Sequence, residues 1–262
     1  MPEFERYLEG KHAIVTGGSR GIGAAIAAEF VGRGAKVTIM GRQRETLEAK
    51  AAELRGDPGV TVAVEQCDVS DASSVTTAFS NAIGSLGPAY ILVNNAGIAT
   101  SRTFTQLSLD VWNDVVTTNM TGTYLCTSEV LPSMISAREG RIVNIASTAG
   151  LRGYKTMSAY CASKHGVIGL TRALALETAK QGITVNAVCP SYTDTYLTGL
   201  AVSNLVSALN KTEDEAMAML LRSVPSGRLI TPEEVASCVA WLCSPGASGV
   251  TGIALPIAGG EV

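Results

Sequence analysis

The sequence predicts an α/β fold, a doubly wound parallel sheet with helices on both faces, in a single domain spanning residues 1–262. Two observations carry this prediction. Short apolar segments alternate with longer helical segments along most of the chain, a pattern typical of βαβ units. A glycine-rich turn joins the first apolar segment to the first helical one. Right-handed crossovers between parallel strands then favour a doubly wound sheet.

The elements follow one another in a regular order. Strands are expected at residues 11–16, 36–40, 60–66, 90–94, 141–147, 183–189 and 253–257. Helices are expected at residues 21–32, 43–54, 72–83, 109–137, 157–179 and 232–242, with Pro132 interrupting the fourth near its end. No linker or repeat separates these elements, so we expect one domain.

This order breaks between residues 190 and 231. The segment has helical signals at residues 200–209 and 213–221 but no strand signal. A long excursion from a compact α/β domain is usually a functional segment. We therefore expect residues 190–226 to form a substrate-binding lid inserted in the domain.

Composition restricts the class of protein. The chain is 46% hydrophobic and 16% charged, with a formal net charge of -3. This supplies a core and gives no reason to expect nucleic-acid binding. Residues 1–10 are polar and acidic, unlike a signal peptide, and no stretch reaches the ~20 apolar residues of a membrane span. Six cysteines without a C-x-x-C pair and only two histidines predict reduced thiols, no metal site and a cytoplasmic location.

The glycine-rich turn reads Thr16-Gly17-Gly18-Ser19-Arg20-Gly21-Ile22-Gly23 and leads directly into a helix. Glycines allow a tight turn and a close approach of the backbone to a pyrophosphate. The helix N-terminus offers free N–H groups and partial positive charge to that anion. In this strand–turn–helix context the motif predicts binding of a dinucleotide, as in Rossmann-type folds.

Tyr160 and Lys164 lie four residues apart in a predicted helix, so their side chains share one face. A free tyrosine has a pKa near ~10, and a nearby ammonium group favours the phenolate. The spacing therefore predicts a tyrosine whose pKa is lowered for acid/base work. The alternative is a surface pair that shares a helix by chance.

Several motifs in order resemble the short-chain dehydrogenase/reductase family, from about residue 10 to residue 260. They are the T-G-x-x-x-G-x-G turn, Cys67-Asp68-Val69, Asn94-Asn95-Ala96-Gly97, Asn119, Ser147 and Tyr160-x-x-x-Lys164. The resemblance implies an NAD(P)-dependent enzyme that moves a hydride between nicotinamide and a ketone or secondary alcohol.

The resemblance also implies roles for residues. Tyr160 would exchange the proton with the substrate oxygen, which Ser147 would bind. Lys164 would hold the nicotinamide ribose, Asn119 would hold a water linking Lys164 to solvent, and Asn94 would position the ribose or shape the helix containing Asn119. The expected cofactor contacts are Gly17, Ser19, Arg20, Gly21, Ile22, Gly23, Arg42, Asp68, Val69, Asn95, Ala96, Gly97, Tyr160, Lys164, Pro190, Thr193 and Thr195.

One position departs from the family pattern. After the sixth strand the family has Pro-Gly, whereas this chain has Pro190-Ser191. If the backbone there required positive φ, the serine would be strained. The nicotinamide end of the site would then be shifted.

The end of the second strand indicates the cofactor. NAD-specific folds place an acid there to bind the ribose hydroxyls, whereas this chain has Gly41 and Arg42. Arg42 can donate two hydrogen bonds to a phosphate, and Arg20 could approach the same phosphate. We therefore expect NADP, with NAD admitted by Gly41. The alternative is that both arginines are solvated surface residues.

Two other functions compete with this hypothesis. The longer sugar-nucleotide epimerases and dehydratases use a similar Tyr/Lys pair but need a larger C-terminal domain. A catalytically silent scaffold or sensor could keep the fold without the reaction. Residues 223–250 are similar to bacterial 3-oxoacyl thioester reductases, which makes such a thioester one candidate substrate. The family resemblance alone suggests a homotetramer built on the helices at 109–137 and 157–179.

Overall fold

The computed structural model describes residues 6–56 and 59–262 and contains one parallel sheet of seven strands. Its strand order is β3-β2-β1-β4-β5-β6-β7. The strands are β1 (His12–Thr16), β2 (Lys36–Gly41), β3 (Val62–Gln66), β4 (Ile91–Asn94), β5 (Gly140–Ile145), β6 (Ile183–Pro190) and β7 (Ala254–Ile257). This confirms the predicted doubly wound fold. The order reverses between β1 and β4, where ligands bind in such sheets.

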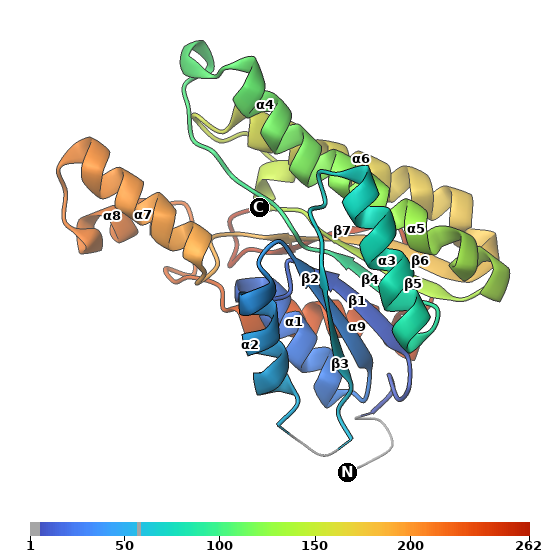
Figure 1. The fold of residues 1–262 in the computed structure, drawn as a ribbon. Helices are drawn as coiled ribbons and strands as arrows, with labels where there is room; N and C mark the ends of the chain where they lie inside the picture. Colours follow the sequence, from blue (N-terminus) through green and yellow to red (C-terminus); the bar gives the residue numbers. More distant parts are fainter. Residues whose placement is uncertain (1–5, 57–58) are drawn as a thin grey trace.

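Helices cover both faces of the sheet (Figure 1). They are α1 (Gly21–Gly32), α2 (Arg44–Leu54), α3 (Ala72–Leu86), α4 (Leu109–Val116), α5 (Gly122–Ala137), α6 (Ser158–Thr178), α7 (Tyr196–Leu209), α8 (Glu213–Leu221) and α9 (Pro232–Leu242). Alternate strand residues face opposite layers: Ala13 and Val15 of β1 belong to a core cluster with side chains of α1, α2 and α9, whereas Ile14 belongs to a second cluster with side chains of α3, α5 and α6. Burial on both faces explains why the strands read as continuous apolar runs.

The predicted helix at 109–137 differs from the observed structure. A π-helical segment, Thr117–Thr121, separates α4 from α5, and Pro132 lies inside α5 rather than interrupting it. Within this segment, the carboxamide of Asn119 exchanges two hydrogen bonds with the backbone of Ile98, 21 positions away. Such π segments are frequent at functional sites.

His12 is buried at the start of β1. Its Nδ1 lies 2.7 Å from the carbonyl oxygen of Gly87, and its Nε2 lies 2.9 Å from Oγ1 of Thr38. Because a carbonyl can only accept, Nδ1 donates and Nε2 accepts the Thr38 hydroxyl. Burial lowers the pKa of His12, with the charge of Lys36 acting in the same direction. The fold therefore holds a neutral imidazole here.

The segment between β6 and α9 carries α7 and α8, which stand away from the sheet (Figure 1). The two helices pack chiefly against each other. Tyr196, Leu197 and Leu200 on α7 are exposed. Within the described residues, no helix combines the length and apolar character needed to cross a membrane.

Candidate active site

The glycine-rich turn connects β1 to α1 and is tied to the end of β4. Oγ1 of Thr16 accepts hydrogen bonds from the backbone N–H groups of Asn95 and Ala96, and the Asn95 side chain donates to the carbonyls of Thr16 and Gly17. Gly17 has φ +65°, and a Cβ there would lie 2.8 Å from Nδ2 of Asn95. These contacts require glycine and bring the turn against residues 95–96.

The N-terminus of α1 opens beside this turn. Its N-cap residue, Arg20, makes no side-chain hydrogen bond to the helix backbone, so the first N–H groups remain available to an anion. The Arg20 guanidinium carbon lies 4.6 Å from the ring centroid of Tyr196, which connects the turn to α7. Gly23 packs too tightly for a side chain, because a Cβ would collide with the carbonyl of Gly17.

A cleft of about 1330 Å³ extends from the glycine-rich turn across the reversal in strand order. Its walls include many of the residues expected to contact the cofactor. These are Gly17, Ser19, Arg20, Gly21, Ile22, Arg42, Asp68, Val69, Asn95, Ala96, Gly97 and Thr195. Gly23, Tyr160, Lys164, Pro190 and Thr193 are not among its lining residues. Gly23 instead permits close packing, and Pro190 and Thr193 are buried beneath the surface.

Sequence reasoning missed other residues of this cleft. Ile98, Thr118 and Leu197 also line it. Ile98 and Thr118 adjoin Gly97 and Asn119 in sequence, and that adjacency was the only signal available. Leu197 lies on α7, within the segment that leaves the sheet after β6, and only the tertiary structure brings it to the cleft.

The carboxyl end of β2 forms one end of the cleft. Arg42 lines a smaller hollow of about 380 Å³ together with Gln66, Asp68 and Ser74. The Gln66 side chain donates to the carbonyl of Arg42, and Asp68 accepts from the backbone N–H and hydroxyl of Ser70. The Arg42 guanidinium therefore stands at a hollow lined by polar side chains.

Asn119 lies in the π segment beside Gly97. Its carboxamide accepts from the N–H of Ile98 at 2.8 Å and donates to the carbonyl of Ile98 and to Oγ of Ser163. A Cβ on Gly97 would lie 3.1 Å from Oδ1 of Asn119 and 3.7 Å from Nζ of Lys164. Because Gly97 has no side chain, Asn119 and Lys164 can both lie close to its backbone. Asn94 is buried elsewhere, donating to Thr127 and Asn144, so it supports α5 and β5.

Ser147, Tyr160 and Lys164 meet at the carboxyl end of β5. Ser147 follows the strand, and its Oγ accepts from the N–H of Ala149 at 3.1 Å. Lys164 is buried, and its Nζ donates to the carbonyl of Ile145 at 2.7 Å and lies 5.7 Å from the ring centroid of Tyr160. Lys164 is therefore not a solvated surface side chain, whereas Tyr160 is half-buried.

The pKa of Tyr160 is opposite to the prediction from spacing. Burial raises it, and the hydrogen bond with Ser147 only partly opposes that effect. Burial also lowers the pKa of Lys164 to about 8. Desolvation disfavours the charged form of each group, so here it outweighs the mutual effect that the shared helix face predicts.

The backbone strain considered for Ser191 is absent, because Ser191 does not have positive φ. Among the described non-glycine residues, positive φ occurs only at Arg138, Thr156 and Asn210. Ser191 is buried, and its hydroxyl donates to the carboxylate of Glu261. Thr193 donates to the carbonyl of Ser191, and Thr195 donates to that of Thr193. The serine is therefore an ordered part of the turn after β6.

Comparisons with known proteins agree with this geometry. The family model for short chain dehydrogenase matches residues 11–205. The chain is 40% identical over 254 residues to the 3-oxoacyl-(acyl-carrier-protein) reductase FabG of Vibrio harveyi, covering 97% of this chain and 98% of that one.

Two solved structures also superpose closely. A single-residue tryptophan variant of actinorhodin polyketide ketoreductase, crystallised with NADPH, has a TM-score of 0.92 at 40% identity, covering 96% of this chain and 97% of that one. The structure of gox2181 has a TM-score of 0.89 at 32% identity, covering 97% of this chain and 96% of that one.

Proposed function

The chain belongs to the short-chain dehydrogenase family, and from this premise we propose that it is an oxidoreductase that uses NADPH to reduce a ketone, with 3-oxoacyl thioesters as the first substrates to test. The observation that carries the proposal is the buried Lys164 ammonium group beside Tyr160 and Ser147. The relatives named FabG and polyketide ketoreductase support the substrate class. These similarities favour an enzyme over a silent scaffold.

The cleft fits a dinucleotide. The uncapped N-terminus of α1 and the turn at Gly17, which leaves no room for a side chain, suit a pyrophosphate. Arg42, with no acid at the end of β2, suits the additional phosphate of NADP. When bound there, the nicotinamide group would supply the hydride.

The side chains of α6 would supply the proton. Because burial raises the pKa of Tyr160, its phenol stays protonated at neutral pH and can donate to a carbonyl oxygen as that oxygen gains charge. Ser147 would donate a hydrogen bond to the same oxygen and hold it beside Tyr160. Lys164 would bind the ribose hydroxyls, since its ammonium group has three donors and the carbonyl of Ile145 occupies one.

Asn119 would hold the water that links Lys164 to solvent, the role that the family resemblance implies. Both amide hydrogens of its carboxamide are bonded, to Ile98 and Ser163, so the water would donate to one of its two carbonyl oxygens. The side-chain oxygen accepts the N–H of Ile98 and the backbone oxygen accepts the Thr123 hydroxyl, and a carbonyl oxygen has two lone pairs. Thr118, in the same π segment, lines the cleft.

The direct test is a panel of ketones and 3-oxoacyl thioesters incubated with NADPH, with loss of nicotinamide absorbance as the readout. We expect turnover of at least one thioester. Tyr160→Phe should reduce turnover by at least ~100-fold, the lower end for general acid–base catalysis, while leaving NADPH binding intact. Binding of NADPH without turnover of any substrate would favour the scaffold function, and a Tyr160→Phe enzyme of near-normal turnover would contradict the assignment.

We further propose that residues 190–226 act as a lid over the substrate and that the chain is a cytoplasmic homotetramer. The lid is supported by the exposed apolar side chains of α7 and by the Arg20–Tyr196 contact. The tetramer is supported by exposed apolar side chains on α5 and α6, Tyr124 at 58% and Leu176 at 84%. Such side chains are candidates for burial between subunits.

A further inference from the structure

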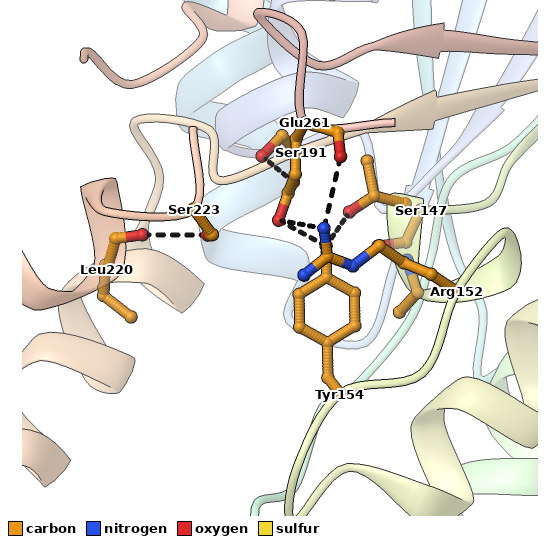
Figure 2. A network of polar contacts seen from close by, with 9 residues as sticks. Ser147, Arg152, Tyr154, Ser191, Leu220, Ser223 and Glu261 are labelled. Carbon is orange, nitrogen blue, oxygen red and sulfur yellow. Dashed lines mark hydrogen bonds and ion pairs between the residues drawn. The ribbon is translucent and has the colours of Figure 1, made fainter. Parts of the chain in front are cut away.

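Glu261, which follows β7, has a fully buried side chain. A buried carboxylate is costly unless hydrogen bonds and charges compensate for lost hydration. One oxygen accepts the hydroxyl of Tyr154 at 2.6 Å, and the other accepts the hydroxyl of Ser191. Arg152 donates to the backbone carbonyl of Glu261 at 3.2 Å, and its guanidinium lies 4.0 Å from the carboxylate. Figure 2 shows these side chains converging on Glu261.

The segment around Glu261 contacts both ends of residues 190–226. At the first end, the N–H of Ser191 donates to the carbonyl of Ile257, in addition to the bond between its hydroxyl and Glu261. At the second end, the N–H of Ser226 donates to the carbonyl of Gly259, which has φ +56°. The segment therefore fixes the two points from which α7 and α8 extend.

The Glu261 carboxylate is also linked, through Tyr154, to the turn that follows the candidate catalytic serine, Ser147. The hydroxyl of Tyr154 lies 2.7 Å from Oγ1 of Thr148, the residue after Ser147. Thr148 and Ala149 form the short turn whose N–H holds Oγ of Ser147. A chain of hydrogen bonds thus runs from Ser191 through Glu261 and Tyr154 to the residue next to Ser147.

We propose that Glu261 is a positioning residue that fixes the loop at residues 148–157 relative to the ends of the 190–226 segment, and thereby sets the geometry of the substrate site. The kinetic part of this inference rests on the function proposed above. The carboxylate suits the task because two oxygens accept hydroxyl donors from two different loops at once. Ser191, where the family has glycine, is one of those donors.

The first experiment measures hydrogen exchange of backbone amides in the full chain and does not depend on turnover. Glu261→Ala removes the carboxylate that accepts from the half-buried Tyr154 hydroxyl and the buried Ser191 hydroxyl, so exchange should quicken roughly tenfold in both 148–157 and 190–226. Glu139→Ala is the matched control, because that carboxylate is exposed and pairs with Lys11 at the opposite end of β5. Unchanged exchange in either region would overturn the proposal.

The second experiment compares steady-state kinetics with a substrate found active in the panel. Glu261→Ala should lower kcat/KM for the ketone by about 10- to 100-fold, the range for small misplacement of reacting groups, while the KM for NADPH changes less than about twofold. Glu261→Gln, which keeps one acceptor, should recover part of the loss. An active wild type with equal kcat/KM in Glu261→Ala would overturn the inference.

If Glu261→Ala does not fold, two milder variants test the same proposal. Tyr154→Phe and Ser191→Ala each remove one side-chain hydroxyl that donates to Glu261 and keep the Glu261 carboxylate. Each should quicken exchange in its own loop and, through Glu261, in the other. Exchange confined to the mutated loop would overturn the proposal. A wild type without turnover would refute the proposed function alone, since hydrogen exchange still decides the positioning role.

Discussion

We expect that combining Gly41→Asp with Arg42→Ala, at the end of β2, reverses the choice of cofactor. The structure accommodates both changes. A Cβ on Gly41 would lie 3.5 Å from Cδ2 of Leu47, an ordinary contact, and Gly41 does not have positive φ. Arg42 is exposed, and its backbone carbonyl keeps the bond from Gln66 whichever side chain is present. We therefore expect an intact fold and a change confined to the cofactor site.

The magnitude follows from the hydrogen bonds exchanged. Arg42→Ala removes charge-assisted bonds to a phosphate, worth about 1.5–3 kcal/mol, with the lower end appropriate for an exposed arginine. Gly41→Asp adds carboxylate bonds to the two ribose hydroxyls of NADH, worth a similar amount, and repels the phosphate of NADPH. Together the two substitutions change the preference between the cofactors by ~3 kcal/mol. This corresponds to a change of about 100-fold in the ratio of kcat/KM for NADPH to kcat/KM for NADH.

The assay measures kcat/KM with each cofactor at one ketone concentration, and the Kd of each cofactor by quenching of protein fluorescence. Arg44→Ala is the matched control, because Arg44 is a neighbouring exposed arginine that pairs with Glu48. The wild type and the control should prefer NADPH, and the double variant should favour NADH. A wild type that prefers NADH would refute the reasoning and identify Arg42 as a solvated surface residue.

Three other predictions concern the lid, the assembly and stability in acid. Limited proteolysis should cut within residues 190–226, and NADPH should slow the cleavage; cleavage elsewhere, without protection, would argue against a lid. Light scattering at micromolar concentration should give the mass of a tetramer, and a monomeric mass would exclude it. Burial lowers the pKa of His12 in the folded chain. As the pH falls, the unfolded chain therefore binds a proton at His12 before the folded chain does, at pH ~6.5. The contribution of His12 to the free energy of unfolding should thus be complete above that pH and fall as the pH drops below it. Urea titrations at about pH 7.5 and 5.5, on either side of that value, should show a lower free energy of unfolding at the lower pH in the wild type. His165→Asn, which changes an exposed histidine, is the control and should show the same decrease. His12→Asn should show a smaller decrease. An equal loss in all three would contradict the role of His12.

Local patterns were sufficient to predict most elements of the fold. Helices α1, α8 and α9 begin and end at the predicted residues, because apolar spacing and glycine positions act over a few neighbouring residues. The glycine-rich turn could be located for the same reason: the steric demand at Gly17 is a property of the turn itself. The π segment was not predicted, and the hydrogen bond that Asn119 makes within it is to Ile98, 21 positions away.

The sequence by itself determined which chemical groups are present and on which elements they lie, including Tyr160 and Lys164 on one helix face. Only the tertiary structure decided their protonation, because the degree of burial sets the desolvation that raises one pKa and lowers the other. The tertiary structure also decided the partner of Ser191, whose hydroxyl donates to the carboxylate of Glu261, 70 positions away. Tyr154 lies 107 positions from the same carboxylate. Such contacts leave no local periodicity in the chain, because packing, rather than the spacing of neighbours, brings the partners together.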